Sequence, residues 1–290
     1  MRKVRIVICL IFIASCVLFG VSRVKSMMTE DKNPPKILFE ETELAISVET
    51  AEEGLWEGVT ATDEEDGDIT DKIQILSSSR LMSGGKRTVK YGVFDNANNL
   101  AVAERTVVYV DYVPPRIYLK KPLRYTMDEL KSSASEVPAK AIDVFEGDIS
   151  DKISLVIENE YIEQPGIYPI MFQVSSSAGD TCSVVCDLEI IDLSDPNEAR
   201  KFYPELSEYI VYTKVNQGLD FRTYLKGIAS GSECYVFGEA STPANITANK
   251  VAIDTNNVNY QTPGVYKVYY SYTTRGGVKA TTILHVVVEE

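Results

Sequence analysis

A repeated spacing of 80 residues constrains the fold of this chain more than any other feature. The pair Pro34-Pro35 recurs as Pro114-Pro115, and the stretch Asp71-Lys72-Ile73 recurs as Asp151-Lys152-Ile153. A constant spacing over both motifs indicates two tandem copies of one module. Chains of small repeated modules are typical of stalks and binding arrays, so the repeat predicts small domains in series.

Alternating apolar residues predict β-strands within each copy. Period-two patterns run through Val89, Tyr91 and Val93, then Ile170, Phe172 and Val174, and then Cys186, Leu188 and Ile190; Thr106, Val108 and Val110 share one face of a further strand. This period is that of a half-buried strand. Closely spaced turns rich in Gly and Asn separate the runs. Each copy is therefore predicted to be a small antiparallel β-sandwich.

A third, diverged copy is predicted from about Pro204 onward. It lacks the acidic motif but repeats the segment Pro165-Gly166-Ile167-Tyr168 as Pro263-Gly264-Val265-Tyr266. Leu284, Val286 and Val288 then share one face of its last predicted strand. The predicted division is an apolar segment at 1–25, a linker at 26–33, domains at 34–113 and 114–193, a linker at 194–203, and a domain at 204–290.

The first 25 residues indicate a membrane or export signal. Arg2, Lys3 and Arg5 precede residues 6–22, which carry no charge. That span is near the short limit for a membrane helix, about 17–25 residues, and also fits a signal peptide. The preceding basic residues favour a single-pass protein with residues 26–290 outside. A cleaved, secreted form is an alternative. So is a lipoprotein modified at Cys16, because Ile13-Ala14-Ser15-Cys16 resembles a lipobox.

Charge limits the partners. The formal net charge is -13, and most of it lies in the two copies that carry the acidic motif. Residues 34–113 hold seven basic and sixteen acidic residues, net -9, and residues 114–193 hold seven and fourteen, net -7. Such a surface repels phosphate backbones, so no nucleic-acid partner is expected. The remaining candidates are the membrane, cations, and a cell-surface protein or glycan.

The stretch Ala61-Thr62-Asp63-Glu64-Glu65-Asp66-Gly67-Asp68-Ile69-Thr70 resembles the A-x-D-x-x-D-G-D-I-T motif of bacterial Ig-like surface domains. These are the domains named after an Ig-like domain of a pesticidal crystal protein, and they are related to hyalin-repeat and cadherin-like modules. The strand from Gly85 to Asp95 and the turn from Asn96 to Ala101 also match the family pattern. In the second copy Glu146 replaces the first Asp of D-G-D, and Ser176 stands where Asp95 does. The resemblance implies an all-β fold of three tandem Ig-like antiparallel β-sandwich domains after an N-terminal apolar helix.

The acidic motif is the one constellation that predicts a ligand. Calcium binds six to eight oxygen atoms, mostly of carboxylates and carbonyls. The sequence therefore gives a candidate calcium site at Asp63, Asp66, Asp68 and Asp95. The alternative is structural, because Asp side chains accept hydrogen bonds from turn N–H groups and glycine permits positive φ. No other cofactor is expected.

No catalytic constellation is expected. The single histidine, His285, alternates with Leu284 and Val286, which predicts that it faces solvent, and one such residue cannot build a catalytic triad. Cys182 and Cys186 share the parity of core positions, and no disulfide is expected. Tyr269 lies opposite to Tyr270 in parity, so it is a candidate exposed aromatic for binding a sugar or protein.

These observations together predict a non-enzymatic, membrane-anchored extracellular protein of a bacterial cell envelope, acting as a stalk or as an adhesion or interaction module. The alternative is an accessory protein that binds carbohydrate or cell wall through residues 204–290.

Overall fold

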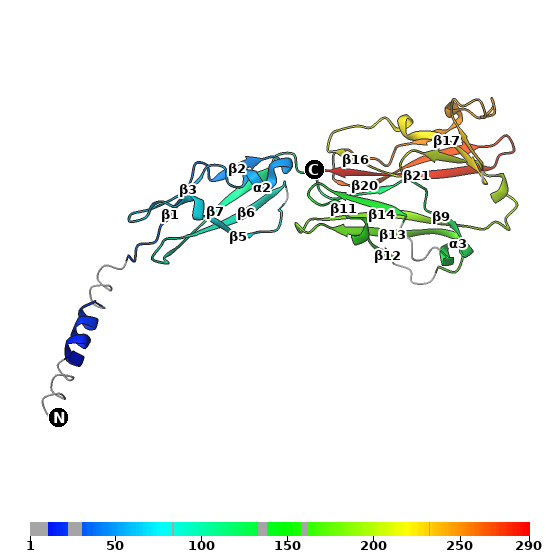
Figure 1. Ribbon diagram of the computed structural model, residues 1–290. Coiled ribbons are helices and arrows are strands. Elements are labelled where there is room, and N and C mark those ends of the chain that lie inside the picture. Colours follow the sequence, from blue (N-terminus) through cyan, green and yellow to red (C-terminus); the bar gives the residue numbers. More distant parts are fainter. Residues whose placement is uncertain (1–10, 23–30, 83, 133–137, 158–161, 232) are drawn as a thin grey trace. The chain divides into compact units, whose positions relative to one another are not determined.

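The computed structural model in Figure 1 describes residues 11–22, 31–82, 84–132, 138–157, 162–231 and 233–290. The chain divides into two compact units, Met1–Tyr112 and Val113–Glu290. Six sheets form three sandwich-like modules, one in the N-terminal unit and two in the C-terminal unit. The predicted all-β class is confirmed.

The first module places three strands against four. One sheet has the order β1 (Lys36–Phe39), β3 (Val59–Asp63), β4 (Gly67–Asp68). The other has the order β2 (Glu43–Ile46), β7 (Leu100–Tyr109), β6 (Lys86–Phe94), β5 (Gln74–Ser78). Val89, Tyr91 and Val93 are buried between the sheets as the alternation predicts. On β7, however, the buried face holds Arg105, Val107 and Tyr109, so the face of Thr106, Val108 and Val110 is the outer one.

The second and third modules repeat this topology strand for strand. In the second module, one sheet has the order β8 (Arg116–Leu119), β10 (Ala139–Asp143), β11 (Gly147–Asp148). The other sheet has the order β9 (Arg124–Thr126), β14 (Thr181–Ile191), β13 (Gly166–Ser175), β12 (Ser154–Ile157). In the third module, one sheet has the order β15 (Tyr203–Leu206), β17 (Leu225–Ser230), β18 (Glu233–Val236). The other sheet has the order β16 (Ile210–Lys214), β21 (Lys279–Glu289), β20 (Gly264–Thr273), β19 (Ala252–Asp254). Although it has lost the acidic motif, the diverged third copy thus keeps all seven strands.

One strand pair in every module is parallel rather than antiparallel. β2 pairs in parallel with β7, β9 with β14, and β16 with β21. The reason lies in the entry to each module. Its first strand breaks after a few residues, and the chain crosses to the other sheet, where the next strand runs alongside the last one. The sequence pattern predicts antiparallel sandwiches, and the structure differs at this one strand pair in each module.

Helical structure is short. Residues 11–22 are helical, and α2 (Ala51–Gly54) and α3 (Met127–Ser132) are short elements of four and six residues. Short 3₁₀ helices are η1 (Val48–Thr50), η2 (Thr70–Lys72), η3 (Ser150–Lys152), η4 (Glu198–Arg200), η5 (Phe221–Tyr224) and η6 (Ala248–Lys250). Within the described ranges, no helix combines the length and hydrophobicity that a membrane span requires. The predicted apolar segment extends into residues 1–10 and 23–25, which lie outside the described residues.

The second and third modules lie side by side in the C-terminal unit and share a continuous set of buried apolar residues (Figure 1). The Tyr212 hydroxyl accepts from the Ile117 amide at 2.7 Å and donates to the Ile117 carbonyl at 2.9 Å. The Tyr209 amide donates to the Leu119 carbonyl at 2.9 Å. Backbone groups of β8 are thus bonded to the third module, so the two modules form one packed body.

This packing overturns one expectation. The alternation along the last strand predicts that His285 faces solvent, but only 3% of its surface is exposed. It does point away from the core of its own module, as its parity requires. The second module covers that outer face, and periodicity within one strand carries no information about a neighbouring domain.

Candidate metal centre and inter-module cavity

The acidic turn of the first module is built around Asp63, at the end of β3. Its Oδ1 atom accepts from the backbone amides of Asp66 at 2.9 Å and Glu65 at 2.8 Å. These bonds stabilise the ionised form and lower the pKa of Asp63 below its usual value. Gly67 closes the turn with φ +75°, a conformation that other residues rarely adopt. The turn therefore holds Asp63 as a carboxylate, and these two bonds use Oδ1 and not Oδ2.

Asp95 lies at the tip of the β6–β7 hairpin and is 5% exposed. Its two carboxylate oxygens accept from the backbone amide and the side-chain amide of Asn99, each at 2.7 Å. Asn98 has φ 69°, the left-handed conformation that Asn tolerates in tight turns. The turn thus fixes a buried carboxylate beside the end of β3.

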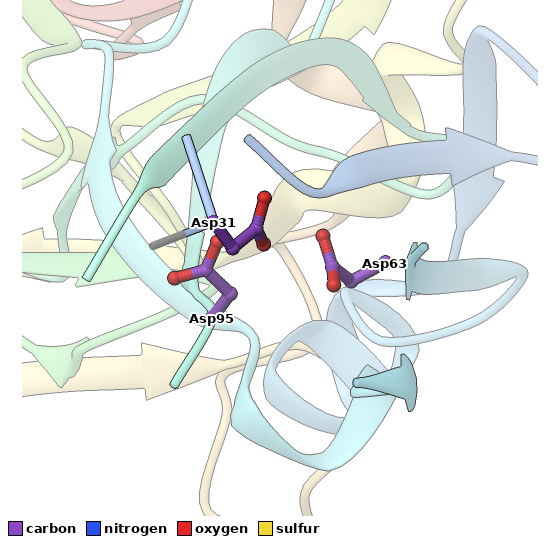
Figure 2. Close-up of side chains that lie close together, drawn as sticks. All are labelled: Asp31, Asp63 and Asp95. Atoms are coloured by element: carbon purple, nitrogen blue, oxygen red, sulfur yellow. The ribbon is translucent and has the colours of Figure 1, made fainter. Parts of the chain in front are cut away.

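A third carboxylate comes from the segment that precedes β1. The Asp31 carbonyl accepts from the Asn99 side chain at 3.1 Å, and the Asp31 carboxylate accepts from the Asn33 amide at 2.9 Å. One carboxylate oxygen from each of Asp31, Asp63 and Asp95 lies within 4.8 Å of the other two (Figure 2). Among the described residues this is the one such group of three or more His, Cys, Asp or Glu side chains.

The chemistry of this acidic centre, Asp31, Asp63 and Asp95, fits a hard cation. Carboxylates this close repel one another, and no ion pair of the described residues reaches any of the three. Calcium takes oxygen ligands at about 2.3–2.6 Å, and carboxylates and backbone carbonyls are its usual protein ligands. Three convergent carboxylates would supply part of a calcium shell and compensate its charge.

The structure brings together only two of the four acidic residues selected from the sequence. Asp66 accepts from the backbone and side-chain amides of Asn96, each at 2.7 Å, and so ties the acidic turn to the hairpin tip. Asp68 accepts from the Thr70 amide at 3.0 Å at the start of η2. Asp66 and Asp68 therefore serve the structural role that was the alternative for this motif, and neither belongs to the centre.

The sequence pattern does not predict Asp31, because residues 26–33 have the composition of a linker. The repeat contained a signal for it, since Asp31 and Asp111 each stand three residues before the Pro-Pro pair of their module. Extending the 80-residue comparison backward past Pro34 would have found this position.

The second module keeps the turn but not the centre. Asp143 Oδ1 accepts from the amides of Phe145 at 2.8 Å and Glu146 at 3.0 Å, as Asp63 does in the first module. Glu146 repeats the role of Asp66. Hydrogen bonds that Glu146 accepts, the larger contribution from the Lys152 side chain and a smaller one from the Ser177 amide, lower the pKa of Glu146 to about 2. Ser176 replaces Asp95, however, and removes one carboxylate.

The second site of interest is a cavity of about 280 Å³ between the second and third modules. Tyr269 and His285 line it from the third module, and Arg124, Asp187 and Glu189 line it from the second. Asp187 pairs with Lys267 at 2.7 Å and lies 3.6 Å from His285 Nε2. Tyr269 is partly buried rather than fully exposed, and it also lines a neighbouring surface hollow with Lys250, Ser271 and Lys279.

The cysteines form no disulfide among the described residues. Cys186 is fully buried, Cys182 is partly buried, and Cys16 and Cys234 are exposed, all as free thiols. Cys16 lies on the helical stretch 11–22. Burial raises the pKa of the Cys186 thiol to about 12, so it is a core side chain and not a nucleophile.

Comparisons with known proteins give little further information. No family model matches the chain, and no curated protein matches it. Among solved structures, it is similar to the CBM51-2 and INT domains of Clostridium perfringens ZmpB, with 19% identity over 56% of this chain and a TM-score of 0.22. It is also similar to the M60 catalytic domain with CBM51-1 and CBM51-2 of the same protein, with 12% identity over 88% of this chain and a TM-score of 0.22. A third similar structure is Drosophila N-cadherin EC1-4, with 11% identity over 90% of this chain and a TM-score of 0.23.

The chain spans 44%, 30% and 76% of those three structures, respectively. At TM-scores this low the likeness carries no argument about what the chain binds.

Proposed function

We propose that the chain is a non-enzymatic interaction protein of a bacterial cell envelope, with Ig-like modules held outside the membrane by the N-terminal segment. The observation that carries this proposal is the threefold recurrence of one seven-stranded sandwich. Repetition of a binding or spacer module is the usual design of a surface array. The resemblance of the acidic turn to bacterial Ig-like surface domains supports the same assignment.

Cys234 allows a direct test of exposure outside the cell. It is an exposed free thiol of the third module. Intact bacteria that express the chain are reduced and then treated with a membrane-impermeant maleimide. We expect labelling of the native chain on intact cells and its loss in Cys234→Ser. Labelling only after lysis would contradict the proposal.

We further propose that the acidic centre binds calcium and stabilises the first module. Calcium bound to the folded state alone adds about 2.7 kcal/mol at a hundredfold excess over Kd. The single tryptophan, Trp56, lies in this module, where its ring packs against Tyr91 with the centroids 6.3 Å apart. Its fluorescence therefore reports the unfolding of the first module within the full chain.

The test compares thermal melts, followed by Trp56 fluorescence, in calcium and in chelator. Calcium should raise the melting temperature of the native chain but not that of Asp63→Asn, which keeps the oxygen that accepts the turn amides. Asp143→Asn changes the equivalent residue of the second module and should respond like the native chain. Identical native melts in calcium and chelator would exclude the site.

A second candidate function is binding of carbohydrate or cell wall by the third module. The observation that favours it is Tyr269, which lines both the inter-module cavity and the neighbouring hollow. An aromatic ring beside hydroxyl and charged groups is suited to stacking on a sugar. Binding of the full chain to purified cell walls should fall for Tyr269→Ala and persist for Tyr235→Ala, which alters β18. Equal binding by the two variants would argue against this site.

A further inference from the structure

Four exposed apolar side chains gather on the outer face of the four-stranded sheet in the first module. Phe94 is 52% exposed, Leu100 45%, Val102 46% and Leu76 46%. Phe94 pairs with Leu100 across β6 and β7, and Gly92 pairs with Val102. Leu76 of β5 packs over Gly92, where an added Cβ would meet its side chain at 2.7 Å. These four residues therefore form one contiguous surface, the β5–β7 patch.

The other two modules show that the fold does not require this patch. The register of each hairpin gives the equivalent positions. Phe94, Leu100 and Val102 correspond to Ser175, Thr181 and Ser183 in the second module, and to Thr273, Lys279 and Thr281 in the third. All six are polar. A contiguous exposed apolar patch is often functional, and the polar residues of the other two modules show that the fold does not need apolar side chains at the positions of Phe94, Leu100 and Val102.

The chain itself shows what can cover this sheet face. In the third module the outward-facing side chains of β20 and β21 contact the second module. Lys267 and His285 face Asp187, and Glu289 pairs with Arg116. These ion pairs lie toward the opposite end of the strands from the positions equivalent to the patch. The Arg124 side chain of the second module, however, also donates to the backbone carbonyl of Thr281, one of those equivalent positions, at 3.2 Å. They establish that another module of this kind can pack on the outer face of the sheet.

We propose that the β5–β7 patch binds the same patch of a second copy of this chain. A two-fold contact places like surfaces together, so the patch would bury its own apolar residues. Lys90 and Glu104 lie on the same face and pair at 2.8 Å. A two-fold axis through the patch would let each lysine meet the glutamate of the other copy, so the face is self-complementary in charge.

Size and charge limit the strength of this dimer. Four partly exposed side chains provide less area than a stable interface of about 800 Å² per partner. The first domain, residues 34–113, also carries a net charge of -9, from seven basic and sixteen acidic residues. The self-association is therefore weak, and added salt strengthens it by screening the repulsion. An electrostatic complex with a basic partner would show the opposite salt dependence.

The second module supplies the residues for a matched variant. Phe94→Ser, Leu100→Thr and Val102→Ser together give the first module the side chains of the second at the same positions. Sedimentation equilibrium of the full chain in detergent should show a native dimer that strengthens with salt. The triple variant should raise the dimer Kd by about tenfold or more, while Trp56 fluorescence remains native. A native chain that stays monomeric, or an equal dimer in both proteins, would overturn the proposal.

Cross-linking locates the contact. Cys9, Cys16 and Cys234 are replaced by Ser, and a cysteine is introduced as Val102→Cys or, as the control, Ser183→Cys. Oxidation should produce covalent dimers far faster for Val102→Cys than for Ser183→Cys. Equal rates would contradict a contact at the patch. A monomer whose new thiol at position 102 is protected from reagents would also contradict it, because the chain would then cover its own patch.

Discussion

At Asp187 a carboxylate of the second module meets two basic side chains of the third. Lys267 Nζ lies 2.8 Å from Oδ1 and 2.7 Å from Oδ2, and His285 Nε2 lies 3.6 Å from Oδ2. The His285 Nδ1 atom lies 3.3 Å from the Tyr209 carbonyl. Both ring nitrogens of His285 therefore face oxygen atoms, one from each module.

The pKa of Asp187 predicts acid sensitivity in the C-terminal unit. Burial opposes ionisation, but the contacts with His285 and Lys267 outweigh it and hold the pKa of Asp187 below its usual value. A carboxyl with a lowered folded pKa stabilises the protein above its unfolded pKa, roughly 4, and loses that contribution as pH falls through the folded value. We expect the melting temperature of this unit to fall from pH 5 toward pH 3 partly for this reason.

Asp187→Asn tests this expectation by calorimetry across that pH range. The variant should be less stable than the native chain at neutral pH, because Lys267 loses its counter-ion. The difference should shrink as the pH falls. Asp254→Asn alters an exposed carboxylate of the third module. This control variant should change neither the stability at neutral pH nor the dependence of stability on pH. A constant difference at all pH values would show that charge at position 187 is not the cause.

At the scale of elements, the β17–β18 pairing depends on a glycine. Gly227 lies opposite Val236, and a Cβ at this position would stand 2.3 Å from the Tyr235 carbonyl oxygen. The obstructing atom is backbone, so the strands themselves would have to separate. We expect Gly227→Ala to destabilise the C-terminal unit by about 1–3 kcal/mol.

Gly218→Ala provides the matched comparison, because no atom lies within 4 Å of its Cβ position. Removing a glycine where the backbone is permissive is neutral or stabilising by about 0.4–1 kcal/mol. Urea unfolding followed by far-ultraviolet circular dichroism measures both variants. Equal midpoints would refute the role assigned to Gly227.

The sequence predicts those elements whose burial partners lie within the same module. The alternation at Val89, Tyr91 and Val93 reflects one sheet packing on another, and it finds the buried face correctly. Arg105 shows where such reasoning fails. It is 3% exposed, and its guanidinium donates to the Leu55 and Glu57 carbonyls. Those backbone acceptors come from a loop whose path the local sequence does not reveal.

The candidate centre could be predicted only in part for a related reason. Asp63 and Asp95 lie in recognisable turns, whereas Asp31 becomes a neighbour through one hydrogen bond from Asn99. The burial of His285 likewise depends on contacts between modules. In both cases the decisive contact joins segments that the repeat pattern treats as separate.

At the scale of the whole molecule, the division into two units predicts two unfolding transitions rather than three. The second and third modules share buried residues and the bonds of Tyr212 to Ile117. Calorimetry of the full chain should resolve two transitions, of which Trp56 fluorescence follows only one. Three transitions would mean that the modules of the C-terminal unit unfold independently.

Tyr212→Phe probes the shared interface. Loss of the hydroxyl leaves the buried amide and carbonyl of Ile117 unpaired, which costs about 1–3 kcal/mol. We expect a lower melting temperature for the C-terminal transition and no change in the one reported by Trp56. A shift of both transitions would indicate that the two units are coupled.

The parallel strand pair in each module has a mechanical consequence. In the first module β2, near the entry of the chain, runs in the same direction as β7, at its exit. A pulling force on the two ends of the module would therefore drag these strands along each other in opposite directions. Their hydrogen bonds would bear the load together in shear instead of opening one at a time. Because β9 with β14 and β16 with β21 repeat the arrangement, every module is built to resist tension along the chain.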